Sequence, residues 1–193
     1  LVYSSSASVY GDPETTPIRE DHPFLNTTFY GATKIAGEAM CTAFHHRYGL
    51  PVVGLRYMNV YGPRQDYKGA YIAVIMRFLD RIDAGLPLQI AGDGSQTYDF
   101  VYVGDVAKAN VCALRSDASD AYYNVGTGTG TSIRELAEIL LELTGADVGL
   151  ELTDSVPTFV SHRVGSTDAA LEDLGFRAGV DLRDGLAKLI EWR

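Results

Sequence analysis

Tyr30 and Lys34 are the residues whose types and spacing point most directly to chemistry. Residues four apart in a helix lie on one face, one turn from each other. A free phenol has a pKa of about 10 and is a poor base at neutral pH, but a neighbouring ammonium favours the phenolate. The pair therefore suits a tyrosine that acts as a general base. The alternative interpretation is two amphipathic residues on a solvated helix face.

A serine-rich turn precedes the pair along the chain. The short apolar run Leu1 to Ser5 has the character of a buried strand, and it stops in the segment 4–11, which reads SSSASVYG. The carboxyl ends of parallel strands are where α/β sheets build their sites. A serine at such an end can hydrogen-bond a substrate hydroxyl and the tyrosine oxygen together. Serines in turns also satisfy backbone groups, and for Ser4 and Ser5 alone we favour that explanation.

Strand and helix patterns alternate along the chain and would position these groups. Apolar residues at helical spacing predict a helix over 29–48, which Gly49 and Pro51 end, and an ordered loop is expected before it over 11–27. The other expected strands are 52–57, 88–91, 97–103, 122–125 and 150–152, and the other expected helices are 70–84, 105–114, 133–143 and two near the C-terminus. The sequence thus predicts an α/β fold with parallel-sheet units early and a smaller mixed lobe late.

The composition bounds the class of protein. The 193 residues carry a net charge of −9, and the scattering of acidic and basic residues disfavours a nucleic-acid surface. The longest apolar run, 70–76, is too short for a membrane span. The first residues lack a charged n-region, so we expect no signal peptide and a cytoplasmic location.

Cysteines and paired histidines do not suggest a metal site. Cys41 and Cys112 sit in helix-like patterns without metal-ligand spacing, which indicates free thiols, with a disulfide as the alternative. His45 and His46 are adjacent in a helix, so they point in different directions, and no third ligand is near. We therefore expect no bound metal.

Several groups of residues, in order along the chain, carry a resemblance to a known family. They are the turn 4–11, the helix start Tyr30-Gly31-Ala32-Thr33-Lys34, and the segments 56–64 (RYMNVYGPR), 92–94, 99–103, 105–107 and 123–128. Together they resemble the extended short-chain dehydrogenase/reductase family, and within it the NAD-dependent epimerase/dehydratase group that includes UDP-glucose 4-epimerases. This implies an α/β fold comprising the late part of a Rossmann-type parallel sheet plus a smaller mixed α/β substrate lobe.

The resemblance also implies a division of the chain. Residues 1–62 would form the C-terminal part of an NAD-binding Rossmann domain with the Tyr-Lys helix. Residues 63–193 would form mainly the nucleotide-sugar-binding lobe, with some strands and helices returning to the Rossmann core. Members of the family commonly form homodimers through the Tyr-Lys helix. Here the small apolar contact surface would be Ala36, Ala39, Met40 and Ala43, although these residues could equally face the core.

By the same resemblance, the chemistry is epimerisation at C4 of a nucleotide-activated sugar through a transient 4-keto sugar, with NAD as cofactor. Tyr30 would remove the proton from the sugar 4-hydroxyl. Lys34 would favour its phenolate and hold the nicotinamide ribose, and Ser6 would bond the same hydroxyl. Met58 matches a position beside the nicotinamide. The substrate-binding set that the resemblance implies is Ser6, Ala7, Ser8, Tyr30, Asn59, Gln89, Tyr98 and Arg163.

Some positions depart from the pattern of the family's neighbouring groups. Sugar 4,6-dehydratases carry Asp then Glu directly after the position of Ser6, whereas this chain has Ala7 and Ser8, so dehydration of that type is not expected. The Gly-rich dinucleotide fingerprint is absent from these residues. We therefore expect a fragment, or an incompletely represented protein, that by itself does not hold NAD tightly. The glycines of 126–130 lack the fingerprint spacing and are interpreted as a lead-in to the helix capped by Ser132.

The cations that would hold a diphosphate are the other departure. Tyr98 stands where many relatives carry an arginine, and the second phosphate arginine, expected near Val156, is also missing. Because guanidinium groups usually hold a diphosphate, another cation should serve. Arg163 and Arg64 are the candidates, and each could equally be an ordinary surface arginine.

Two other functions remain open at this point. One is an oxidoreductase or decarboxylase of the same fold, in which the 4-keto sugar is reduced or decarboxylated. The other is a non-catalytic binding relative, although the intact set of Ser6, Tyr30 and Lys34 argues against it.

Overall fold

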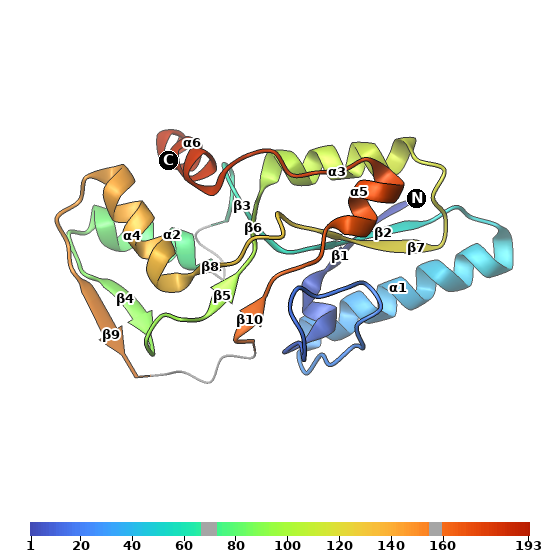
Figure 1. Ribbon diagram of the computed structural model, residues 1–193, viewed down its shortest axis with the longest axis horizontal. Helices are drawn as coiled ribbons and strands as arrows, with labels where there is room; N and C mark the ends of the chain where they lie inside the picture. The colour runs from blue at the N-terminus through green and yellow to red at the C-terminus, as the bar shows by residue number, and fades with distance from the viewer. Residues whose placement is uncertain (67–72, 155–159) are drawn as a thin grey trace.

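The computed structural model describes residues 1–66, 73–154 and 160–193. A three-stranded parallel sheet forms the centre of one half of the molecule. Its strands lie in the order β1 (Val2–Ser6), β2 (Val53–Tyr57) and β7 (Ala121–Val125). Helix α1 (Phe29–Tyr48) covers one face, and α3 (Val103–Arg115) and α5 (Asp168–Leu174) cover the other (Figure 1). The register places Ser5, Arg56 and Asn124 in one row across the strands.

The central strand of the sheet, β2, is buried on both faces. Its residues Val53 to Arg56 are all buried, the pattern expected of a parallel strand with helices on both sides. Leu55 and Val125 pack with Ala109 of α3 in one apolar core. Because parallel strands need crossover connections, α1 joins β1 to β2, and the sheet's carboxyl ends all meet at one edge.

The other half of the molecule has its own apolar core. A parallel pair, β4 (Leu88–Ala91) and β9 (Leu150–Thr153), lies beside α2 (Val74–Asp83) and α4 (Ile133–Thr144), and α6 (Leu182–Trp192) packs against α4 (Figure 1). Phe78, Leu140 and Leu189 are buried together there. Short strands lie between the halves: β3 (Asn59–Tyr61) pairs with β6 (Phe100–Tyr102), while β5 (Thr97–Tyr98) pairs with β8 (Thr131–Ser132) and β10 (His162–Arg163).

The predicted helix over 29–48 is confirmed at both ends. Thr28 accepts a hydrogen bond from the Gly31 amide at the start, and Gly49 takes the left-handed conformation at the end, with φ 67°. Two other predictions were wrong at their boundaries. The helix expected over 70–84 begins only at Val74, and residues 70–72 lie outside the described residues. The strand expected over 97–103 is broken at Asp99 and ends before Val103, which starts α3.

Very short elements escaped the sequence patterns. They are the 3₁₀ helix η1 (Ala7–Tyr10) and the strands β3, β8 and β10, all of two to four residues. A pattern with a period of two or 3.6 residues cannot be recognised over such lengths. Of the described helices, none is both long and apolar enough to cross a bilayer.

Candidate active site

Lys34 ties the start of α1 to the end of β1. Its Nζ donates to the Ser4 carbonyl oxygen at 2.8 Å and lies 5.5 Å from the centre of the Tyr30 ring. The phenol of Tyr30 is 57% exposed, so it is open to a ligand. The structure thus brings the two residues together on one face of α1 at the carboxyl edge of the sheet, as their spacing predicted.

The serine turn packs against the first turn of α1. A Cβ on Gly31 would lie 2.7 Å from the Ser8 carbonyl oxygen, so a glycine is needed for this close approach. Ser6 caps η1: its Oγ accepts the Ser8 amide at 3.2 Å, which leaves its own hydroxyl proton free to be donated. Ser8 Oγ is buried and has no hydrogen-bond partner among the described residues. Ala7 is buried in the core, so only its backbone could face a ligand.

Met58 is buried in the core, like Ala7. It is only 5% exposed, in the core, and its Cγ lies 2.8 Å from where a Cβ on Gly126 would be. The structure therefore packs Met58 against Gly126 and Gly165, and its place beside a nicotinamide stays a prediction.

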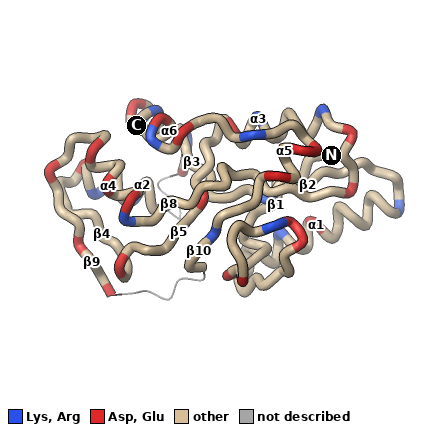
Figure 2. Tube along the Cα trace, viewed as in Figure 1, with Lys and Arg blue, Asp and Glu red and all other residues tan. Residues whose placement is uncertain are grey.

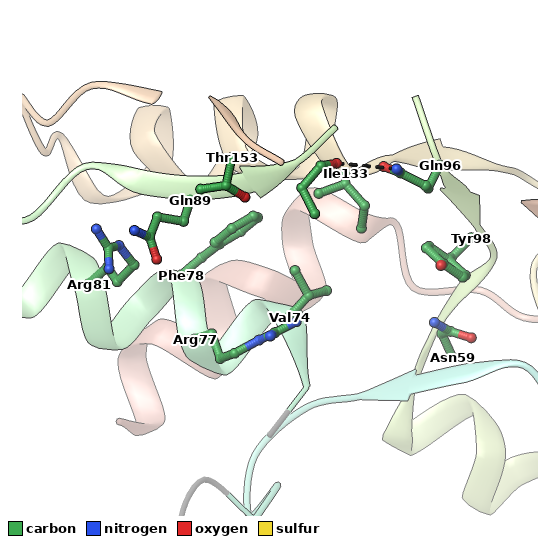
Figure 3. Close-up of a pocket in the computed structure, with 11 residues that line it drawn as sticks. Asn59, Val74, Arg77, Phe78, Arg81, Gln89, Gln96, Tyr98, Ile133 and Thr153 are labelled. Carbon is green, nitrogen blue, oxygen red and sulfur yellow. Dashed lines mark hydrogen bonds between the residues drawn. The ribbon is translucent and has the colours of Figure 1, made fainter. Parts of the chain in front are cut away.

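A cavity of about 460 Å³ brings three predicted substrate residues together (Figure 3). Asn59 and Tyr98 lie at one end of it and Gln89 at the other. The remaining lining residues come from α2, β4, α4, β9 and the turn before β5: Val74, Arg77, Phe78, Arg81, Ala91, Gln96, Ile133 and Thr153. Tyr98 donates its hydroxyl to the Val160 carbonyl at 3.0 Å, and burial raises the pKa of that phenol.

Two arginines that the sequence analysis did not single out, Arg77 and Arg81, line this cavity from α2. Arg81 is held in place: it donates to the Pro87 carbonyl and lies 3.6 Å from Glu151, which also accepts the Gln89 amide at 2.9 Å. Arg77 is exposed, and within the described ranges it makes no ion pair. Their spacing of four residues, which places both on one helix face, was the available signal.

Neither of the predicted replacement cations lines this cavity. Arg163 is half-buried on β10, where it pairs in register with Tyr98 and donates to the Gly11 carbonyl at 3.4 Å. Burial lowers the pKa of Arg163, and its Nε has no partner in the part of the chain that the structure describes. Arg64 is exposed at a backbone φ of 69°.

A buried carboxylate, Asp99, organises the glycine-rich loop 126–130. Its oxygens accept the Thr127 amide and hydroxyl, both at 2.8 Å, and the Gly128 amide at 2.9 Å. Burial raises the pKa of Asp99, although the bonds from Thr127 and Gly128 act in the opposite direction. Because an internal carboxylate engages these two amides, they are not available to a phosphate, which supports the interpretation of this loop as a structural one.

Comparison with known proteins agrees with this arrangement. The model of the NAD dependent epimerase/dehydratase family matches residues 1–126, about two thirds of the chain. The chain belongs to this family. It is 37% identical over 98% of its length to a UDP-glucose 4-epimerase of Mycolicibacterium smegmatis, of which it covers 60%.

Solved structures of the epimerase/dehydratase family superpose on nearly the whole chain. A UDP-N-acetylglucosamine 4-epimerase from Methanobrevibacter ruminantium, in complex with UDP-N-acetylmuramic acid, gives a TM-score of 0.94 at 35% identity, over 99% of this chain and 61% of the other. A Thermotoga maritima UDP-glucose 4-epimerase with UDP-glucose gives 0.93 at 34% identity, over 99% and 62%. This chain thus spans about 60% of the length of these relatives.

We predict a pH-dependent contribution of Asp99 to stability. Its raised pKa means that the folded protein holds the proton more tightly than the unfolded chain. The stabilisation that comes from this tighter proton binding is therefore fully present below the ordinary aspartate pKa of 3.8. It is lost as the pH rises through the pKa of Asp99 in the folded protein. The difference in Tm between wild type and Asp99→Asn, measured from about pH 3 to about pH 7, should fall as pH rises.

The Tm difference for the exposed Asp117→Asn substitution is measured over the same range as the matched control. A difference for Asp99→Asn that is constant or grows with pH would contradict the prediction.

Proposed function

We propose that the complete protein inverts C4 of a nucleotide-activated sugar of the UDP-glucose/galactose or UDP-uronic acid type, with NAD as cofactor. One observation carries the proposal: the Lys34 ammonium joins Tyr30 to the carboxyl end of β1. A second site feature supports it, the cavity that gathers Asn59, Gln89 and Tyr98 with two arginines. Family membership and the named relatives point to the same chemistry.

The residues at the end of β1 suit the nicotinamide end of NAD and the sugar. Ser8 Oγ, buried and unpartnered among the described residues, offers an unused hydrogen bond there, and the Tyr30 phenol is open. Lys34 uses one of its three N–H groups on Ser4 and keeps the others for a ribose. When bound, NAD supplies the hydride acceptor and donor that no side chain can provide.

In this proposal the chain's own groups move the proton. Tyr30 takes the proton of the sugar 4-hydroxyl as the carbon is oxidised and returns it when the carbon is reduced on the opposite face. Lys34 places its positive charge beside the Tyr30 ring, and Ser6 donates its free hydroxyl proton to the oxygen of the sugar 4-hydroxyl. No carboxyl group stands at Ala7 or Ser8, so this turn lacks an acid and a base for removing water from the sugar.

The cavity beside α2 would hold the nucleotide part. A diphosphate carries charge that guanidinium groups bind well, and Arg77 and Arg81 are the arginines on the cavity wall. Gln89 and Asn59 add amide groups at its two ends (Figure 3). We therefore assign residues 1–62 mainly to cofactor and proton transfer and 63–193 mainly to the nucleotide sugar, with α3 and β7 returning to the first core.

We further propose a homodimer formed through α1. The residues Ala36, Ala39, Met40 and Ala43 are all exposed, which argues against the core-facing alternative. Between Phe29 and Tyr48 only Lys34, Glu38 and Arg47 carry full charges, and this outer helix is mostly uncharged in Figure 2. An apolar surface of this kind is typical of protein interfaces.

A cytoplasmic location is proposed for the same protein. The sulfur atoms of Cys41 and Cys112 are unpaired in the structure, which suits a reducing compartment.

Tyr30→Phe should abolish epimerisation, because a phenyl ring cannot accept the sugar proton. We expect kcat to fall by roughly 10²–10⁴-fold with NAD and a UDP-sugar. Tyr48→Phe, on the same helix and 71% exposed, is the control and should leave kcat unchanged. Formation of the C4 epimer without net NADH is the readout. Unchanged turnover of Tyr30→Phe would refute the catalytic assignment, whereas net NADH or carbon dioxide would indicate the oxidoreductase or decarboxylase alternative.

Arg77→Ala should weaken binding of the nucleotide sugar. Loss of a charge-assisted hydrogen bond to a diphosphate corresponds to roughly a tenfold to hundredfold rise in KM, with kcat largely retained. Arg115→Ala, at the exposed end of α3, is the matched control and should change neither constant. Equal KM values for wild type and Arg77→Ala would exclude Arg77 from the site.

Met40→Glu should dissociate the proposed dimer, since it places a charge in the apolar face of α1. We expect the molar mass from light scattering to fall from two chains to one at micromolar concentration. Leu114→Glu changes a similarly exposed residue on α3, on the other side of the sheet, and should leave the mass unchanged. A monomeric wild type, or a dimer that survives Met40→Glu, would contradict the assignment.

A further inference from the structure

A buried carboxylate lies one helical turn below the Tyr-Lys pair. Tyr30, Lys34 and Glu38 are spaced four residues apart and share one face of α1. Glu38 is only 4% exposed. A buried carboxylate requires charged or hydrogen-bonding partners, because leaving water is otherwise too unfavourable. Its nearest helical neighbour of opposite charge is Lys34, yet no bond joins these two described side chains.

Glu38 is instead engaged by the sheet. Arg56 of β2 holds it in a fork, with Nε to Oε1 at 3.0 Å and a terminal nitrogen to Oε2 at 2.8 Å. Ser5 of β1 donates its hydroxyl to Oε1 at 2.5 Å. Parallel bonds of this kind are the strongest and most directional contact between a guanidinium and a carboxylate. Both oxygens of Glu38 are therefore occupied on the sheet side.

Arg56 is itself fixed in this place. Its remaining terminal nitrogen donates to the Tyr10 hydroxyl and to the Glu20 carbonyl, both at 2.8 Å. The rings of Tyr10, Phe24 and Tyr122 surround the guanidinium, with centres 5.1, 5.0 and 5.4 Å away. Burial by itself lowers the pKa of Arg56, but Glu38 and Tyr10 together outweigh that effect and raise the pKa. The guanidinium therefore stays charged and is held by these bonds.

Lys34 and Glu38 reach consecutive residues of β1. The ammonium bonds the Ser4 carbonyl, and the carboxylate bonds the Ser5 hydroxyl. Opposite charges four residues apart on one helix pair when neither has a better partner. An ammonium drawn toward Glu38 would leave the Tyr30 ring and would have its charge neutralised.

We propose that Arg56 is a positioning residue that captures Glu38 and so keeps the Lys34 ammonium free for Tyr30. This inference rests on the proposed function, because it concerns the same proton transfer. Arg56 acts through Glu38 and Lys34 and touches neither sugar nor cofactor. Other titratable side chains face this cluster in the described structure: Tyr3 of β1, whose ring centre is 5.7 Å from Lys34 Nζ, Cys41 of α1, and Tyr10 and Tyr122 beside Arg56. Burial raises the pKa of each of them, so they add no charge at neutral pH. The Glu20 carboxylate also acts on Tyr10, and it accepts the Asn124 amide at 2.9 Å.

The test compares Arg56→Met with the double variant Arg56→Met/Glu38→Gln in the complete protein. The single variant removes the only cation bonded to Glu38 in the described structure and leaves it the Ser5 hydroxyl, so we expect Lys34 Nζ to move from Ser4 to Glu38 in its crystal structure. The acidic limb of its pH profile for kcat should then shift to higher pH by roughly one pH unit. In the double variant the competing charge is gone, so Lys34 should return to Ser4 and the profile to its wild-type position.

A purely structural role would not produce this pattern. If Arg56 had only a structural role, both variants would have a lower Tm and the pH profile of the single variant would not move. That result would overturn the inference. Arg56→Lys is the second variant if Arg56→Met does not fold. It keeps a cation beside Glu38 and should leave the profile in place, so a shifted profile there would also overturn the inference. The crystal structures report on Lys34 even without turnover, whereas failure of the proposed function is registered separately by unchanged activity of Tyr30→Phe.

Discussion

The placement of α1 on the sheet depends on the buried ion pair between Glu38 and Arg56. Arg56 ties the helix to β2, Ser5 of β1 donates to the same carboxylate, and Tyr10, which accepts a bond from Arg56, donates to Asn124 of β7. Removing one partner of such a pair is destabilising by about 3–5 kcal/mol, since the other charge is left buried. Replacing both partners by apolar groups is often neutral. The pair therefore fixes where the helix sits more than it adds to total stability.

The ion pair at Glu38 also fixes the positions of Tyr30 and Lys34, because all three residues belong to the same helix. Glu38 is two turns from Tyr30, and a helix turn advances about 5.4 Å, so a slip of one turn at Glu38 would move Tyr30 by the same amount. The capping bond from the Gly31 amide to Thr28 and the close contact of Gly31 with Ser8 fix the other end. Between these two anchors, the Lys34 ammonium donates to the Ser4 carbonyl of β1 and faces the Tyr30 ring.

Local signals predicted the α1 region well, and the reason is physical. The helix 29–48 has a capping threonine, helical spacing of apolar residues and a glycine stop, and each of these acts within a few residues. The break at Asp99 depends on two amides that lie 28 and 29 residues further along the chain. No local pattern contains that information. The same holds for the fork from Arg56, which joins residues 18 apart on different elements.

The candidate site shows the same division. The Tyr-Lys pair could be predicted because its members lie on one helix, and Asn59, Gln89 and Tyr98 followed from the family pattern. The sequence analysis missed Arg77 and Arg81, because their spacing does not show which face of α2 is turned toward β4 and the cavity. Only the packing of Ile75 and Leu79 into the second core turns the arginines of α2 toward the cavity.

The overall charge makes these two arginines more important than their number suggests. A protein of net charge −9 repels a diphosphate at long range, but salt screens that repulsion beyond about 8 Å. For the diphosphate binding that we propose, the local charge of the cavity therefore matters more than the net charge of the chain. Glu151 lies 3.6 Å from Arg81 and offsets part of its charge, whereas Arg77 has no such neighbour in the described structure. Most of the positive charge on the cavity wall that no described carboxylate offsets then comes from Arg77. Arg77 lies on α2, whereas the phosphate arginine of many relatives stands at the position of Tyr98 on β5.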